Sequence, residues 1–116
     1  MDLNLKKMEQ LETEIVNFFK LSTGIRNIDL DTNIGSERYK IFDLDAENLM
    51  QTFFKKYNID YSNFIVNKYF IYPEYSWRSL IFIRLFFDKV EYPLKPALTI
   101  KHLVAVAQRK EWFDPI

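Results

Sequence analysis

The chain has 116 residues, of which 48% are hydrophobic and 17% aromatic, and this composition predicts one folded domain over residues 1–116 rather than a disordered segment. Lysines plus arginines number 16, as do aspartates plus glutamates, so a formal net charge of zero gives no general attraction to nucleic acid. The lack of cysteine excludes disulfides, thiolate metal sites and cysteine nucleophiles.

The hydrophobic segments are short. The N-terminus has no apolar signal-peptide core, and the longest nearly apolar run, residues 80–87, contains Arg84. A run of this length cannot span a bilayer as a helix. We therefore expect a cytoplasmic protein with no membrane partner and no nucleic-acid partner.

The first predicted helix covers residues 3–21. Its apolar positions recur at helical spacing: Leu5, Met8, Leu11, Ile15, Phe18 and Phe19. Gly24 suits a left-handed turn at the C-terminal end of this helix. A loop is expected from 25 to 42, with a turn at Gly35.

The second predicted helix follows this loop and ends near Tyr57. Its apolar stripe is formed by Ala46, Leu49, Met50, Phe53, Phe54 and Tyr57. Asp43 and Asp45 precede the stripe, and either can cap the helix and complement its dipole. If Asp45 is the cap, then Leu44 and Leu49 have the spacing of a hydrophobic staple.

The stretch between the second and last helices is rich in aromatic residues. Residues 60–63 suit a turn, and residues 65–71 are rich in strand formers, which favours a short extended segment. Ser76 is a candidate cap for a helix beginning after it. Residues 80–87 stay open between strand and helix, because β-branched and aromatic residues favour a strand whereas Arg84 and Asp88 have helical spacing. Most of the aromatic side chains are expected in the core.

The last predicted helix begins after Thr99, its expected cap, and Leu98 and Leu103 have staple spacing. Ile100, Leu103, Val104 and Ala107 form its apolar face. Trp112 and Phe113 are expected to fold back onto the bundle.

Candidate catalytic and metal-binding groups are sparse. His102 is the single histidine, and no cysteine accompanies it, so we expect no metal site and no catalytic base there. The acidic residues between 29 and 47 lack the spacing and glycine of a calcium loop. No combination of nucleophile, base and orienting group is visible, and we therefore expect that the protein is not an enzyme.

Short motifs resemble acyl carrier proteins. The run Asp43-Leu44-Asp45, with Asn48-Leu49 after it, resembles the Asp-Ser-Leu-Asp motif at the start of the second helix of those proteins. The residues from Leu98-Thr99 to Leu103, followed by Trp112, are similar to the closing helix of the acyl-carrier-like family DUF1493. The resemblance covers roughly residues 11–112.

The resemblance implies a mostly α, small acyl-carrier-protein-like helical bundle. It also implies a long loop in which Ile34 fills the core, and an insertion before the last helix that is helical or includes one short extended segment. For residues 65–71 it implies a short helix, and this alternative to the extended segment stays open. It favours the helical reading of residues 80–87. The neutral charge of this chain departs from the acidic character usual in carrier proteins.

The resemblance places Asp43 where carrier proteins have the serine that carries phosphopantetheine. A carboxylate cannot form the same stable phosphodiester as a serine hydroxyl. Asp43 is most simply a helix cap. We expect a non-catalytic, carrier-like protein without a cofactor, which contacts an unidentified protein partner through Asp43, Leu44, Asp45, Glu47 and Asn48. The alternative is a genuine phosphopantetheine carrier that uses another serine, such as Ser36.

Overall fold

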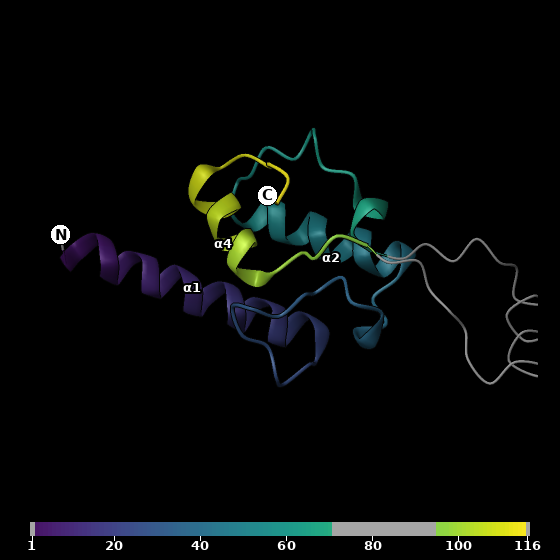
Figure 1. The fold of residues 1–116 in the computed structure, drawn as a ribbon. Helices are drawn as coiled ribbons and strands as arrows, with labels where there is room; N and C mark the ends of the chain where they lie inside the picture. The colour runs from purple at the N-terminus through teal and green to yellow at the C-terminus, as the bar shows by residue number, and fades with distance from the viewer. Residues whose placement is uncertain (1, 71–94, 116) are drawn as a thin grey trace, which may run out of the picture.

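The computed structural model describes residues 2–70 and 95–115, which are arranged as a small helical bundle (Figure 1). The α-helices in these ranges are α1 (Asp2–Thr23), α2 (Asp43–Lys56) and α4 (Ile100–Arg109). Two single-turn 3₁₀ helices, η1 (Glu37–Tyr39) and η2 (Val66–Lys68), lie in the connecting segments. Within the described ranges, extended pairing is limited to the isolated bridges Asn33–Thr99 and Asp60–Glu111, so the predicted mostly helical class is confirmed.

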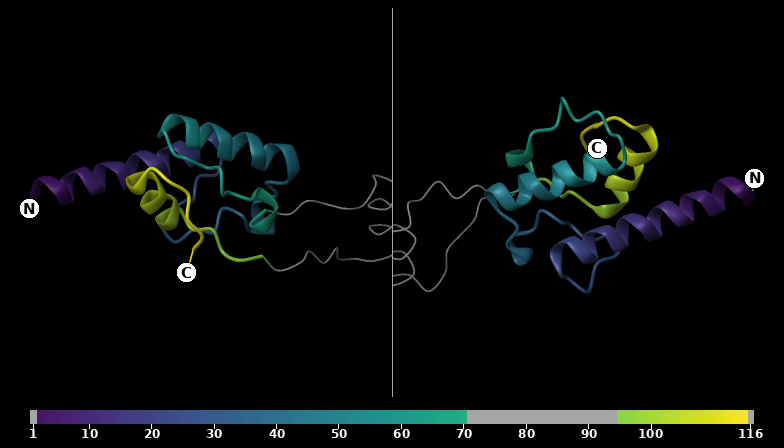
Figure 2. Two further views of the ribbon diagram at one scale, coloured as in Figure 1. Left: turned by 90° about the horizontal axis from the view of Figure 1, so that it is seen from above. Right: turned by 180° about the vertical axis from the view of Figure 1, so that it is seen from behind.

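Helix α1 covers the predicted range and extends it by one or two residues at each end. Ile15, Phe18 and Phe19 are buried, whereas residues 6–10 are exposed, including Met8, which was predicted on the apolar face. The N-terminal half of the helix extends past the rest of the described chain (Figures 1 and 2). Gly24 ends the helix with φ of 74°, and its N–H donates to the carbonyl of Lys20, as the predicted left-handed turn requires.

The part of the core between α1 and α2 is aromatic. The Phe53 ring lies 5.9 Å from that of Phe18 and 5.3 Å from that of Phe19, measured between centroids. All six predicted apolar positions of α2 are buried. The helical periodicity therefore identified the inward face of this helix correctly.

The loop from 25 to 42 crosses the bundle and supports the start of α4. The N–H of Ile34 donates to the carbonyl of Leu98 at 2.9 Å, and the N–H of Lys101 donates to the carbonyl of Leu30 at 2.8 Å. The Ile34 side chain is completely buried, so the prediction that it fills the core is confirmed. The loop thus holds α4 in place through backbone hydrogen bonds as well as through packing.

Helix α4 begins and ends with local features that the sequence indicated. The Thr99 hydroxyl oxygen accepts the backbone N–H of His102 at 3.2 Å, which confirms the cap. Leu98 and Leu103 are both buried beside it, in agreement with the staple. The helix ends at Lys110, whose φ of 64° is left-handed.

The C-terminal tail folds back onto the segment after α2, as expected. Trp112 is 3% exposed, and its N–H donates to the carbonyl of Asp60 at 2.7 Å. Asp114 accepts hydrogen bonds from the Tyr69 hydroxyl at 2.6 Å, the Lys68 ammonium at 3.0 Å and the Trp112 indole at 3.2 Å. These bonds hold the pKa of Asp114 well below its ordinary value, at about 2.

The aromatic stretch after α2 is described only up to residue 70. Residues 66–68 form η2, which is the helical one of the two alternatives open for residues 65–71. Tyr69 and Phe70 are buried, as expected of core aromatics. The predicted cap at Ser76 and the open assignment of residues 80–87 lie outside the described residues.

Candidate functional site at the start of helix α2

The prediction that Asp43 or Asp45 caps α2 is wrong, because both residues lie inside the helix and neither precedes it. Asp43 is its first residue, and the residue before it, Phe42, has extended backbone angles of φ −126° and ψ 157° with no side-chain cap hydrogen bond. The Phe42 carbonyl accepts the N–H of Asp45 at 3.1 Å, so Asp45 is already inside the first turn. Asp45 is nevertheless well placed to complement the helix dipole.

The predicted hydrophobic staple is also wrong. Leu49 is buried, but Leu44 is 68% exposed. A staple requires the residue before the cap, and Leu44 instead occupies the second position of the helix itself. Leu44 therefore presents an apolar side chain to solvent on the first turn.

The predicted contact residues all lie in the first turn and a half of α2, but they differ in solvent exposure. Leu44, Asp45 and Asn48 are exposed, and Glu47 is half-buried. Asp43 belongs to the helix by its backbone. The outward stripe of the helix continues beyond them with Gln51 and Lys55, which are both exposed.

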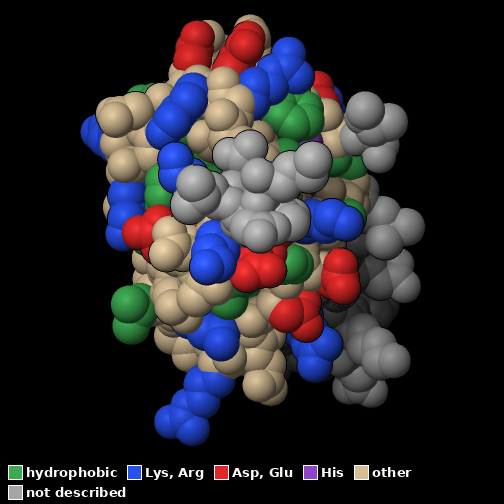
Figure 3. Space-filling model, turned by 90° about the vertical axis from the view of Figure 1, so that its left-hand side faces the viewer, with side chains coloured by type: hydrophobic (Ala, Val, Ile, Leu, Met, Phe, Trp, Pro, Cys, Tyr) green, Lys and Arg blue, Asp and Glu red, His purple; other side chains and the backbone are tan. Residues whose placement is uncertain are grey.

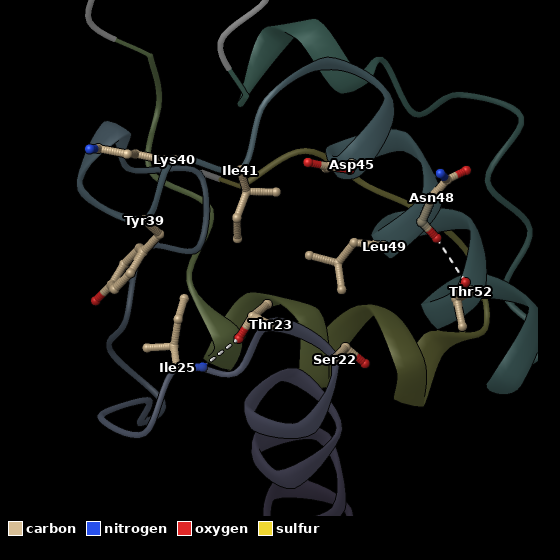
Figure 4. Close-up of a pocket in the computed structure, with 10 residues that line it drawn as sticks. All are labelled: Ser22, Thr23, Ile25, Tyr39, Lys40, Ile41, Asp45, Asn48, Leu49 and Thr52. Atoms are coloured by element: carbon tan, nitrogen blue, oxygen red, sulfur yellow. Dashed lines mark hydrogen bonds between the residues drawn. The ribbon is translucent and has the colours of Figure 1, made fainter.

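A surface pocket of about 540 Å³ lies on one side of α2, between this helix, the end of α1 and the loop (Figure 4). Ile41 and Leu49 point toward one another across it, while Lys40 points away at the rim (Figure 4). Its hydroxyl groups are partly committed to backbone, since Thr52 donates to the Asn48 carbonyl at 2.8 Å. The pocket therefore offers a small apolar floor without a convergent set of charged groups.

A smaller hollow of about 230 Å³ lies on the other side of α2, and the sequence analysis did not anticipate it. Aromatic residues form much of its wall: the Tyr61 ring stacks on Phe54 with centroids 5.0 Å apart, and Phe64 meets the same ring edge-on at 5.0 Å. Glu47, Met50, Gln51 and Val66 complete the lining. Beside Val66 in the chain, Ile65 is 59% exposed.

Tyr61 and Ile65 were missed because a single sequence does not show which apolar residues of an irregular segment stay at the surface. The available signal was the polar composition around them, Asp60, Ser62, Asn63 and Asn67, which indicates a surface segment. Tyr61 and Ile65, together with Leu44, make this side of α2 the more apolar part of the site.

Ser36, the serine of the alternative carrier function, does not lie at the start of an α-helix. It is half-buried and precedes η1, and its hydroxyl oxygen accepts the backbone N–H of Arg38 at 3.3 Å. It lines a polar hollow of about 440 Å³ together with Asp29, Asp31 and Arg38. Its local role is therefore that of a turn residue.

Phosphopantetheine is attached to proteins through a hydroxyl, and the first turn of α2, residues 43–46, contains none. The start of this helix does not fit that group as a covalent anchor. His102, the other candidate for chemistry, donates from Nε2 to the Phe113 carbonyl at 2.7 Å and lies edge-on to the Trp112 ring. Its contacts tie the tail to α4.

Charged side chains of both signs are interspersed on the face of the molecule that Figure 3 shows. On the face at the N-terminal end of α1, basic and acidic side chains alternate among small apolar areas (Figure 3). Over residues 2–70 and 95–115, no three histidine, aspartate or glutamate side chains come together as metal ligands do. No helix in these two ranges has the length and apolar character needed to cross a membrane.

Comparison with known proteins gives a family match. A family model described as "Protein of unknown function (DUF1493)" matches residues 2–114. No curated protein matches the chain, and no solved structure does.

Proposed function

The chain belongs to the DUF1493 family, and from that premise we propose that it is a non-catalytic, acyl-carrier-like protein that acts by contacting another protein through the start of α2. The observation that carries the proposal is Leu44, a large apolar side chain that is 68% exposed on the first turn of a helix. Exposed apolar side chains bordered by polar groups are typical of contact surfaces.

The surroundings of Leu44 support a contact role rather than a catalytic one. Asp45 and Asn48 are exposed beside it and provide a polar border. The aromatic hollow lined by Phe54 and Tyr61 lies along the same helix and can receive an apolar side chain of a partner. A serine-free first turn is consistent with contact that needs no prosthetic arm.

A site-specific photo-crosslinker tests the contact role in the full chain in its native host. Placed at Asn48, it is expected to give a protein adduct, and placed at Gln10 on α1, it is expected to give none. Both positions are exposed amides, which makes Gln10 a matched control. In the Asn48 background, Leu44→Glu or Asp45→Lys should weaken the adduct. Equal adducts at both positions, or adducts that ignore both substitutions, would contradict the proposal.

The alternative function is a genuine phosphopantetheine carrier with the arm on Ser36. The observation in its favour is that Ser36 shares its hollow with Arg38, a cation suited to a phosphodiester. The intact mass of the protein purified from its native host separates the two functions. A mass equal to that of the sequence rejects the carrier for most molecules, whereas an increment equal to the arm that disappears in Ser36→Ala establishes it.

A further inference from the structure

Two methionines of the described chain differ sharply in their exposure to solvent. Met8 lies on the N-terminal half of α1 and is 38% exposed, whereas Met50 lies in the buried stripe of α2 and is 1% exposed. The chain has no cysteine, so its sulfur is all in methionine. Oxidation of a thioether requires that the oxidant reach the sulfur atom. Met8 is therefore the better placed of the two to react with a peroxide from solution.

The Met8 sulfur also has a polar partner on another helix. Helices α1 and α4 pack against one another (Figure 1). In the last turn of α4, the Gln108 amide donates from Nε2 to the Met8 Sδ atom at 3.2 Å. A thioether sulfur is only a weak acceptor. The contact thus places an N–H donor directly against the atom that oxidation would change.

Oxidation of this sulfur replaces a weak acceptor with a strong one. With hydrogen peroxide, a lone pair of the sulfur attacks one oxygen and the O–O bond breaks. The proton of the transferred oxygen passes to the leaving hydroxide, which departs as water. The sulfur loses two electrons and becomes a sulfoxide, and the peroxide gains them. The sulfoxide oxygen is polar, so a neighbouring N–H group is well suited to bind it.

We propose that Met8 is an oxidation site of this protein and that Gln108 binds its sulfoxide, so that oxidation by a peroxide preserves the packing of α1 on α4. A sulfoxide in an apolar core disrupts packing, but Met8 lies at the surface beside an exposed Gln108 side chain that can shift to meet the new oxygen. The exposed product also stays accessible to methionine sulfoxide reductases, which makes the modification reversible.

This inference does not depend on the proposed contact role of α2. Met8 and Gln108 lie on α1 and α4, and neither of them lines the pocket or the aromatic hollow beside α2. The failure of one proposal therefore leaves the other standing.

Peptide mapping of the full chain after a short pulse of hydrogen peroxide tests the site. Trypsin releases Met8 in the peptide 8–20 and Met50 in the peptide 41–55, so each sulfoxide is measured separately. In the folded protein, Met8 should be oxidised at least about tenfold faster than Met50, and the two rates should become similar in concentrated urea. Equal rates in the folded protein would overturn the assignment of the site.

Thermal unfolding before and after oxidation tests the role of Gln108. The wild type should keep its midpoint, whereas oxidised Gln108→Glu, which has nearly the same shape but no N–H donor on its side chain, should lose about 3 °C or more. Gln108→Leu removes the donor without adding a charge and should lose a similar amount. Met8→Leu, treated in the same way, should not change, which assigns the effect to Met8 rather than to oxidation elsewhere.

The results that would overturn the role of Gln108 are equally definite. One is a wild type that loses as much as the two Gln108 variants on oxidation, and another is a pair of variants that lose nothing. A loss in Met8→Leu equal to that of the Gln108 variants would show that Met8 is not the cause. Circular dichroism before treatment checks that each variant retains its helices.

Discussion

The Oδ1 atom of Asn33 accepts the backbone N–H of Leu98 at 2.9 Å, across a separation of 65 residues. The same oxygen accepts the N–H of Gly35 at 3.1 Å. One amide side chain therefore shapes the turn of the long loop and joins that loop to the residue before the cap of α4. The site depends on this junction indirectly, because the loop also forms one wall of the pocket beside α2.

Asn33→Ala is expected to destabilise the protein by about 1–3 kcal/mol, because two backbone N–H groups lose their acceptor in a half-buried place. Asn33→Asp keeps an acceptor oxygen and should cost clearly less. Urea unfolding followed by circular dichroism measures both. Equal losses for the two variants would show that the amide oxygen is not what joins the loop to α4.

Gly35 allows a close approach of the loop to the segment after η2. A Cβ at this position would overlap the carbonyl oxygen of Tyr69, which is backbone and cannot move aside easily. Gly35→Ala should therefore cost about 2–3 kcal/mol through displaced backbone. Gly24→Ala is the comparison, since a Cβ there meets no atom within 4 Å and only the positive φ opposes it.

For Gly24→Ala, the strain of a left-handed alanine is about 1 kcal/mol. Thermal unfolding of both variants should rank Gly35→Ala as the less stable one. The reverse order would mean that the loop relaxes away from Tyr69 at little cost.

The hydroxyls of Tyr57 and Tyr69 have opposite environments, which makes them a matched pair. The Tyr57 hydroxyl is buried and has no hydrogen-bond partner among the described residues, while the Tyr69 hydroxyl donates to Asp114. Burial, followed by the nearby Glu14 carboxylate, raises the pKa of Tyr57. Removing an unsatisfied buried hydroxyl is nearly neutral or stabilising, whereas removing a bonded one is not.

Tyr57→Phe should therefore leave the free energy of unfolding unchanged or raise it slightly, and Tyr69→Phe should lower it by about 1 kcal/mol. Chemical unfolding of the two variants in the same buffer measures the difference. A marked loss in Tyr57→Phe would indicate that its hydroxyl has a partner in solution.

Asp114 should make the stability depend on pH in the acid range. Its pKa is lowered from 3.8 to about 2 in the folded protein, first by the Tyr69 hydroxyl and then by the Lys68 ammonium and the Trp112 indole. A lowered folded pKa means that the stabilisation is fully present above pH 3.8 and is lost as the pH falls toward about 2.

The Asp114→Asn variant should be less stable than the wild type at neutral pH, and the two should converge as the pH falls through this interval. Urea midpoints measured at several pH values test this. A constant difference between the two proteins from neutral pH down to pH 2 would show that the carboxylate charge is not the cause.

The sequence by itself determined the features that depend on local spacing and local chemistry. Helical periodicity identified the buried faces of α2, α4 and the C-terminal half of α1, whereas Met8 of the predicted α1 face is exposed. Gly24 and Thr99 marked a helix end and a helix start that the structure confirms. Such signals are local because a residue's face on a helix depends on its spacing from residues three and four positions away. The burial of Ile34 and the return of Trp112 were also foreseen, partly through family resemblance.

Only the tertiary structure decided where α2 begins and what surrounds its outer face. The sequence favoured a side-chain cap of α2 at Asp43 or Asp45, but the helix begins without one. Burial of its apolar stripe stabilises the helix instead. The exposure of Leu44 and its position relative to Tyr61 and Ile65 depend on how the segment after α2 packs. That packing involves residues far apart in the chain, and no periodicity of a single segment encodes it.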